Sequence, residues 1–143
     1  MSDDRAELVE VDQSRHRLYG PRCLLVCGLE PEDQERMQGM ADGLGDLKVV
    51  FAGAGDTERR LGELLDYDDA YGLGQPASLP AAIIMSGLSG EELHLLMATY
   101  RKLALPAPLW ATLTPTSEKW PLGKLLAELA AEHASFEGEG GSS

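Results

Sequence analysis

Side chains with the chemistry to bind an anion follow several apolar segments of the chain. Glycines leave backbone amides accessible there, and Ser and Thr hydroxyls stand at the expected helix starts. The predicted ligand-binding residues are Gly28, Glu30, Gly87, Ser89, Thr114, Thr116 and Ser117. The same hydroxyls would also serve as helix caps, bonding to amides of the chain itself. An anion site and a set of caps are therefore the two interpretations.

The remaining reactive side chains do not form a recognisable centre. His16, His94 and His133 stand far apart, and none belongs to an H-E-x-x-H pattern. Cys23 and Cys27 are four residues apart, which in a strand places them about 13 Å apart. A disulfide requires Cα atoms within about 7 Å, so we expect two buried free thiols. No catalytic residue, metal site or cofactor is assigned from the sequence.

The elements that must position these residues follow the same order in both halves of the chain. The predicted strands are 23–27, 47–52, 82–86 and 109–113, and the predicted helices begin near residues 31, 61, 90 and 122. The runs 23–27 and 82–86 both end in Gly-Leu, which is typical of a buried strand entering a tight turn. Ser89 and Glu92 have the spacing of a capping box. We interpret this order as an internal repeat.

The repeat defines the predicted domain organisation. An N-terminal arm at 1–20 precedes a single α/β domain at 21–136, and a flexible tail occupies 137–143. The domain consists of two units, 21–66 and 81–136, which a linker at 67–80 joins.

Each unit reads as strand, helix, strand, helix, and such a crossover makes its two strands parallel. The two most apolar strands belong in the centre, which gives a mainly parallel four-stranded sheet of order 2-1-3-4 with helices on both faces. A two-layer α+β sheet is the alternative. In the first arrangement both Gly-Leu corners lie at the same end of the sheet. The predicted ligand site is the crevice beyond the carboxyl ends of the first and third strands.

Three motifs stand out in the second unit: Gly87-Leu88-Ser89-Gly90-Glu91-Glu92-Leu93, Thr114-Pro115-Thr116-Ser117 with Trp120, and Leu125-Leu126-Ala127-Glu128-Leu129. On these motifs the second unit resembles a small prokaryotic family, domain-of-unknown-function family 3783, over about residues 80–136. The first unit departs from this pattern, with Gly53-Ala54-Gly55-Asp56 in place of the Thr-Pro-Thr-Ser turn. The resemblance implies domain limits and no known reaction.

Charge disfavours two classes of partner. The chain has 143 residues with 12 Lys+Arg and 24 Asp+Glu, a formal net charge of −12. Such a surface repels the phosphates of nucleic acids and anionic membranes. No apolar run approaches the roughly 18 residues of a membrane span, and the acidic start has no signal-peptide core. We therefore expect a cytoplasmic protein.

Two functions follow from these patterns. The first is a non-catalytic binding or regulatory module, whose partner is an unknown protein or a second copy of the chain. Its predicted contact residues are Trp120, Tyr67 and Tyr71, because exposed aromatic side chains are favoured at interfaces. The alternative is a small-molecule or anion-binding domain, with or without catalysis, that uses the predicted crevice.

Overall fold

The computed structural model describes residues 17–45 and 47–142, so most of the predicted arm lies outside the described part of the chain. The strands are β1 (Cys23–Cys27), β2 (Lys48–Ala52), β3 (Ala82–Ser86) and β4 (Leu109–Thr112). The helices are α2 (Pro31–Gly43), α3 (Leu61–Leu64), α4 (Gly90–Lys102) and α5 (Leu122–Ser142), with short 3-10 turns η1 (Ala54–Asp56) and η2 (Ser117–Lys119). Each predicted strand and helix start is present at its predicted place, because apolar spacing and turn residues act locally.

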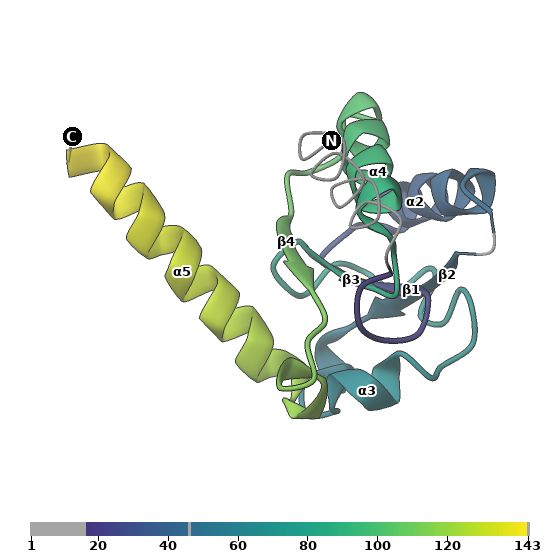
Figure 1. Ribbon diagram of the computed structural model, residues 1–143, viewed down its shortest axis with the longest axis horizontal. Helices are drawn as coiled ribbons and strands as arrows, with labels where there is room; N and C mark the ends of the chain where they lie inside the picture. Colours follow the sequence, from purple (N-terminus) through teal and green to yellow (C-terminus); the bar gives the residue numbers. More distant parts are fainter. Residues whose placement is uncertain (1–16, 46, 143) are drawn as a thin grey trace, which may run out of the picture.

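The strands form one sheet of order β2-β1-β3-β4, which confirms the predicted order. β1 is parallel to β2, and β3 is parallel to β4, with α2 and α4 as the crossovers. Figure 1 shows α2 and α4 on one face of the sheet, and α3 with the start of α5 on the other. The fold is therefore a three-layer α/β arrangement, and the two-layer alternative is wrong.

Alternate residues of each central strand supply the cores on the two faces. Leu24 and Val26 of β1 face α2 and α4, where they belong to one cluster with Met37. Leu25 of the same strand faces α3 and α5 and belongs to a second cluster with Leu61. Every side chain of β1 and β3 is buried, which explains why both strands are unbroken apolar runs.

The relative direction of the two halves corrects the prediction. β1 and β3 are antiparallel, with Cys23 opposite Ser86 and Cys27 opposite Ala82. The two Gly-Leu corners therefore lie at opposite ends of the central strands. The expectation that both corners lie at the same end of the sheet is wrong. The reason is the connection between the halves. After α3 the chain is back at the start of β2, where the Nζ of Lys48 donates to the carbonyl oxygen of Leu65. Residues 69–71 then run parallel to β2, with the N–H of Phe51 donating to the carbonyl oxygen of Tyr71. This extra pass returns the chain to the end of the sheet where β1 ends, and the chain enters β3 from there.

The two halves also meet through a reciprocal pair of hydrogen bonds on the α3–α5 face. The N–H of Leu61 donates to the carbonyl oxygen of Trp120 (3.0 Å), and the N–H of Leu122 donates to that of Arg59 (2.9 Å). With the antiparallel β1–β3 pair, these contacts relate the halves by an approximate two-fold rotation.

Helix α5 extends the molecule beyond the sheet. It has 21 residues and continues to Ser142, through the range 137–142 where the sequence predicts a flexible tail. In Figure 1 its C-terminal half projects away from β4. Within the described residues, no helix combines the length and the apolar character that crossing a membrane requires.

Candidate functional site

Gly28 and Glu30 lie at the end of the sheet where β1 and β2 terminate, and the linker 67–80 covers this end. The Oε1 atom of Glu30 accepts a hydrogen bond from the N–H of Ala77 (3.0 Å). A space of about 10 Å³ remains beneath the linker, next to Gly28. That volume holds about one water molecule, so the chain's own linker closes this end of the sheet to a small-molecule ligand.

A buried glutamine that sequence reasoning missed holds the linker in place. The Nε2 of Gln34 donates to the carbonyl oxygens of Leu29 (2.9 Å) and Gln75 (2.7 Å), and its Oε1 accepts from the N–H of Gly74 (2.6 Å). Gln34 is 4% exposed and lies on the buried side of α2, three residues before Met37. A polar residue at an apolar position of a helix stripe was the available signal.

Gly87 lies at the opposite end of the sheet, where β3 and β4 terminate, and the segment 17–22 passes over it. The Nη1 of Arg17 donates to the carbonyl oxygen of Gly87 (3.1 Å), and the N–H of Gly87 donates to that of Tyr19 (3.2 Å). The hydroxyl of Tyr19 donates to Glu118 of η2 (2.8 Å). The two corners of the predicted crevice thus lie at different ends of the sheet, and the chain itself covers each of them.

Ser89 caps α4 and confirms the predicted capping box. Its Oγ accepts from the N–H of Glu92 (3.2 Å), and the Oε1 of Glu92 accepts from the N–H of Ser89 (3.0 Å). Burial favours a higher pKa for Glu92, but the bonds from Ser89 and Arg22 and the charges of Arg22 and Arg17 outweigh it, so the pKa is lowered. An ionised carboxylate therefore already occupies the helix start, which weakens any attraction for a second anion.

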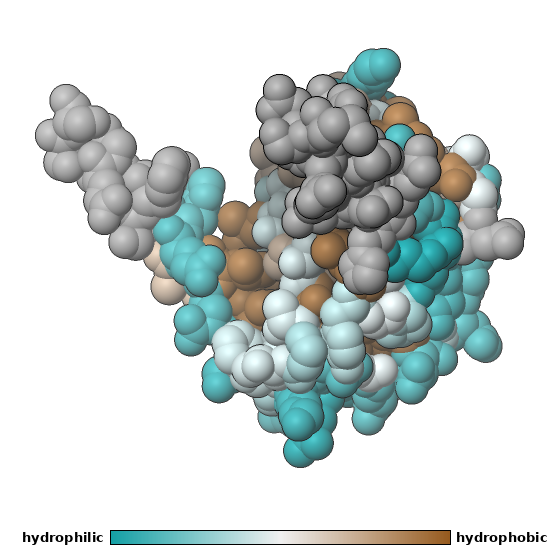
Figure 2. Space-filling view, viewed as in Figure 1, coloured by the Kyte–Doolittle hydropathy of each residue, from teal (hydrophilic) through white to brown (hydrophobic). Residues whose placement is uncertain are grey.

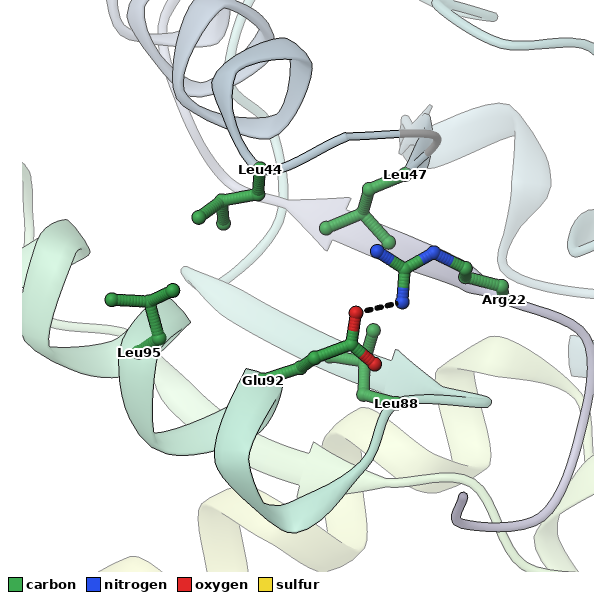
Figure 3. A pocket seen from close by; sticks show the side chains of 6 residues that line it. All are labelled: Arg22, Leu44, Leu47, Leu88, Glu92 and Leu95. Carbon is green, nitrogen blue, oxygen red and sulfur yellow. Dashed lines mark hydrogen bonds and ion pairs between the residues drawn. The ribbon is translucent and has the colours of Figure 1, made fainter. Parts of the chain in front are cut away.

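A small apolar pocket opens beside this capping box, between the end of α2 and the start of α4 (Figure 3). The ion pair between Arg22 and Glu92 forms one wall. The other lining residues are Leu44, Leu47, Leu88 and Leu95. The pocket has a volume of about 30 Å³. Ligand pockets usually measure roughly 300–1,000 Å³, so this one is too small for a metabolite.

A wider and shallower groove of about 300 Å³ lies at the start of β2. Its polar walls include Asp42, Asp69 and Lys48. The Nε2 of Gln38 donates to the carboxylates of Asp42 (3.1 Å) and Asp69 (3.3 Å), and the Nζ of Lys48 donates to a backbone carbonyl. These charged groups are engaged within the chain, so the described residues of the groove present no converging donors for a ligand.

Thr114 and Ser117 bond to each other at the start of η2. The Oγ of Ser117 accepts from the N–H of Thr114 (3.0 Å), and the Oγ1 of Thr114 accepts from the N–H of Ser117 (3.0 Å). The side chain of Thr116 is exposed. These are the bonds of a cap, which leave the paired hydroxyls less able to serve an anion.

Ser117→Ala should lower the free energy of unfolding by about 1 kcal/mol, because the N–H of Thr114 loses its acceptor. Thr116→Ala is the matched control at an exposed neighbour and should change it by less than about 0.5 kcal/mol. Urea unfolding of both variants measures the difference. Equal values for the two would contradict the cap.

Tyr67 and Tyr71, two of the predicted contact residues, are half-buried and anchor the linker. Their rings lie 4.6 Å apart, and the hydroxyl of Tyr71 donates to the buried carboxylate of Asp56 (3.2 Å). The carbonyl oxygen of Tyr71 also accepts from the N–H of Phe51 in β2 (2.8 Å). These tyrosines therefore help to cover the outer edge of β2, and their role as an interface stays a prediction.

Trp120, the third predicted contact residue, lies between η2 and α5. It is half-buried against the α3–α5 core, and the Nζ of Lys124 stands 4.4 Å from its ring centroid. Trp120 is thus partly available to a partner on the same side of the molecule as α5.

The two thiols are free and buried in β1. Burial raises the pKa of Cys23 and of Cys27 to about 12 in each case. Among the described residues, no group of three or more His, Cys, Asp or Glu side chains is arranged to hold a metal ion.

Neither cysteine should react with a thiol reagent in the folded protein at pH 8, because only the thiolate attacks and a pKa near 12 leaves almost none of it. Ellman's reagent should label both residues only at the rate at which the protein unfolds. The denatured chain is the control and should react at once. Rapid labelling of the native protein would contradict the burial of β1.

The outer edge of β4 is the feature that sequence reasoning did not single out. The N–H groups of Leu109 and Leu113 donate to β3, so the backbone groups of Trp110 and Thr112 point outward. Within the described residues, these outward groups have no hydrogen-bond partner. The equivalent edge of β2 is covered by Tyr71. The sequence signal was the absence of any charged residue from 103 to 117.

Hydrophobic surface adjoins this edge. Figure 2 shows it at the base of the hollow between α5 and the body of the domain. Four partly buried hydrophobic residues from β4, from the turn before α5 and from α5 itself pack on the α3–α5 core: Leu109, Ala111, Trp120 and Leu129. We call the β4 edge together with these four side chains the β4–α5 surface.

Comparison with known proteins gives one match. No curated protein and no solved structure matches the chain. A family model described as "Domain of unknown function (DUF3783)" matches residues 81–136, which comprise β3, α4, β4, η2 and the first part of α5. The match confirms the resemblance predicted for the second half, and the matched residues include β4 with its open edge.

Proposed function

We propose that the protein is a non-catalytic interaction module that binds a protein partner through the β4–α5 surface. The observation that carries this proposal is the open and uncharged edge of β4. Natural sheets protect such edges with charges, prolines, bulges, short strands or covering segments, because an unpaired edge is a template for another chain. Among the described residues, the segment at Tyr71 covers β2, whereas no segment covers β4. The protection that β4 does have is its length of four residues and Pro106 and Pro108 before it.

Capture from the native host tests this function. The tagged full chain, cross-linked in cells, should retain a bound protein that Thr112→Pro no longer retains, because proline removes an outward N–H from the edge. Thr112→Val is the matched control, since it keeps the N–H. Failure to capture any protein, or equal capture by both variants, would count against an interaction module that works through β4.

We also infer that the first half is a diverged copy of the DUF3783 unit. Its support is structural correspondence: α2 and α4 each have 13 residues, and β1 and β3 each have five. The reciprocal bonds of Leu61 and Leu122 add to it. A family member with only one unit should then form the same four-stranded sheet as a homodimer, and a monomeric single-unit member with a complete fold would argue against the copy.

The free thiols favour a reducing compartment, since disulfides are rare in the cytoplasm. We therefore propose that the module acts in the cytoplasm. Fractionation of host cells would place the protein there, and recovery from an extracytoplasmic fraction would contradict it.

A further inference from the structure

We propose that the β4–α5 surface joins two copies of this chain, with their β4 strands paired antiparallel across a two-fold axis. This inference rests on the proposed function and names the partner of the same surface.

The backbone of β4 is complementary to itself. In an antiparallel pair centred on Ala111, Trp110 of one copy lies opposite Thr112 of the second. Opposite residues of this kind exchange both of their N–H and C=O groups. All the outward groups of Trp110 and Thr112 are then satisfied in both copies. The central pair is Ala111 with Ala111, whose small side chains tolerate the close approach of two strands.

The absence of charge around β4 also suits a second copy of the chain. No Lys, Arg, Asp or Glu occurs from residue 103 to 117, so no like charges are brought together at the centre of the joint. The chain as a whole carries a net charge of −12, which would oppose most other ways of bringing two copies together. The uncharged edge is therefore the part of the described surface best suited to self-association.

Helix α5 gives the second contact. A two-fold axis perpendicular to the sheet keeps both α5 helices on the same face of the joined sheet and makes them antiparallel. With 21 residues, α5 is about 31 Å long. Figure 1 shows it running outward past β4, on the side of the sheet where the second copy would lie.

Charged side chains in the first half of α5 form opposite-charge pairs in that arrangement. Lys124, Glu128 and Glu132 are exposed and follow one another at intervals of four residues, so they form a single slanting row. When two such rows run antiparallel with Glu128 at the two-fold axis, Lys124 of one copy approaches Glu132 of the other. These two attractive pairs flank the two Glu128 side chains, which repel each other at the centre. The same pairing occurs twice because the contact is symmetric.

Sedimentation of the full chain over about 1–100 μM tests the proposal, because dissociation constants of weak dimers fall in that range. We expect a species of twice the chain mass of 15.4 kDa. Thr112→Pro should weaken the dimer at least about tenfold by removing an outward donor from each copy, whereas Thr112→Val should leave it intact. Circular dichroism and the melting temperature check that both variants fold.

A charge-reversal pair keeps the test informative if Thr112→Pro does not fold. Lys124→Glu alone and Glu132→Lys alone should each weaken self-association several-fold, and a mixture of the two should restore it as a heterodimer, because unlike charges then meet at both contacts. Weaker or equal association of the mixture relative to either single variant would overturn the α5 contact.

Three results would overturn the dimer. The wild-type chain could be monomeric throughout, it could dimerise equally well with Thr112→Pro, or it could dimerise only after residues 2–16 are removed, in which case its own N-terminus occupies the edge. A monomer that still captures another protein through β4 would refute the dimer and leave the proposed function standing. A chain that neither self-associates nor captures another protein would refute both the dimer and the proposed function.

Discussion

Replacing Gly87 by alanine should lower the free energy of unfolding by about 4 kcal/mol and the melting temperature by roughly 15 °C. Gly87 has φ +70°, a left-handed conformation that costs a side-chain-bearing residue about 1–2 kcal/mol. An added Cβ would also stand 2.6 Å from the carbonyl oxygen of Gly20 and 2.7 Å from the N–H nitrogen of Arg22. Both are backbone atoms, so the segment 17–22 would have to move off the edge of the sheet. Differential scanning calorimetry measures the loss.

Gly28→Ala should have an effect of similar size, because Gly28 is the matching corner. Its φ is +77°, and an added Cβ would lie 2.5 Å from the backbone nitrogen of Ala81 and the carbonyl oxygen of Leu79. Gly39→Ala in α2 is the control: nothing lies within 4 Å of its added Cβ, and it should stabilise the protein by about 1 kcal/mol. A corner variant as stable as the Gly39→Ala chain would show that the antiparallel β1–β3 pairing is wrong.

The corners illustrate which parts of the fold the sequence can specify. The runs 23–27 and 82–86, their Gly-Leu turns and the Ser89 capping box depend on residues a few positions apart, and all appear in the structure as predicted. The strand order also follows, because the two most apolar strands must be central. Each of these features is set by local pattern or by burial alone.

The direction of β3 relative to β1 depends instead on the course of the linker 67–80. Both directions give the same order and bury the same residues, so apolar patterning does not distinguish them. The deciding facts are the pass that the linker makes alongside β2 and the contacts that hold it against β2 and α2. These contacts join residues 21 positions apart (Val50 and Tyr71) and 41 positions apart (Gln34 and Gln75), and no local pattern encodes them.

The candidate site shows the same division. The cap formed by Thr114 and Ser117 was one of the two interpretations of that turn, because capping is local. The predicted order 2-1-3-4 already placed the fourth strand at an edge, but the sequence did not show that this edge is left open while that of β2 is covered. Whether another segment covers an edge depends on the complete topology. For this reason the proposed partner surface emerges only from the folded arrangement.

Gln34→Leu should lower the free energy of unfolding by about 3 kcal/mol. The leucine fits the apolar surroundings but leaves the N–H of Gly74 and the carbonyl oxygens of Leu29 and Gln75 without their partner. Buried backbone groups that lose a partner cost about 1–3 kcal/mol each, less where water can reach them. The linker should open first, so hydrogen exchange at Gly74 should accelerate more than exchange in β1.

Gln38→Leu is the matched control, one helical turn further along α2. Its Nε2 bonds only to the exposed carboxylates of Asp42 and Asp69, so the loss should stay below about 1 kcal/mol. An equal loss at both positions would mean that Gln34 does not clamp the linker.

Gln34→Glu adds a dependence on pH whose sign is fixed by the same contacts. The carboxylate can still accept from Gly74, but its other oxygen would face the carbonyl oxygens of Leu29 and Gln75, which repel it. The protonated form is favoured in the folded protein, so the pKa of this residue rises above its unfolded value and stability falls as pH rises through it. The variant should therefore approach the wild type in stability near pH 4 and fall behind it near pH 8. A constant difference across that range would show that the linker has left α2, because only a group still held against those carbonyls can sense the change in charge.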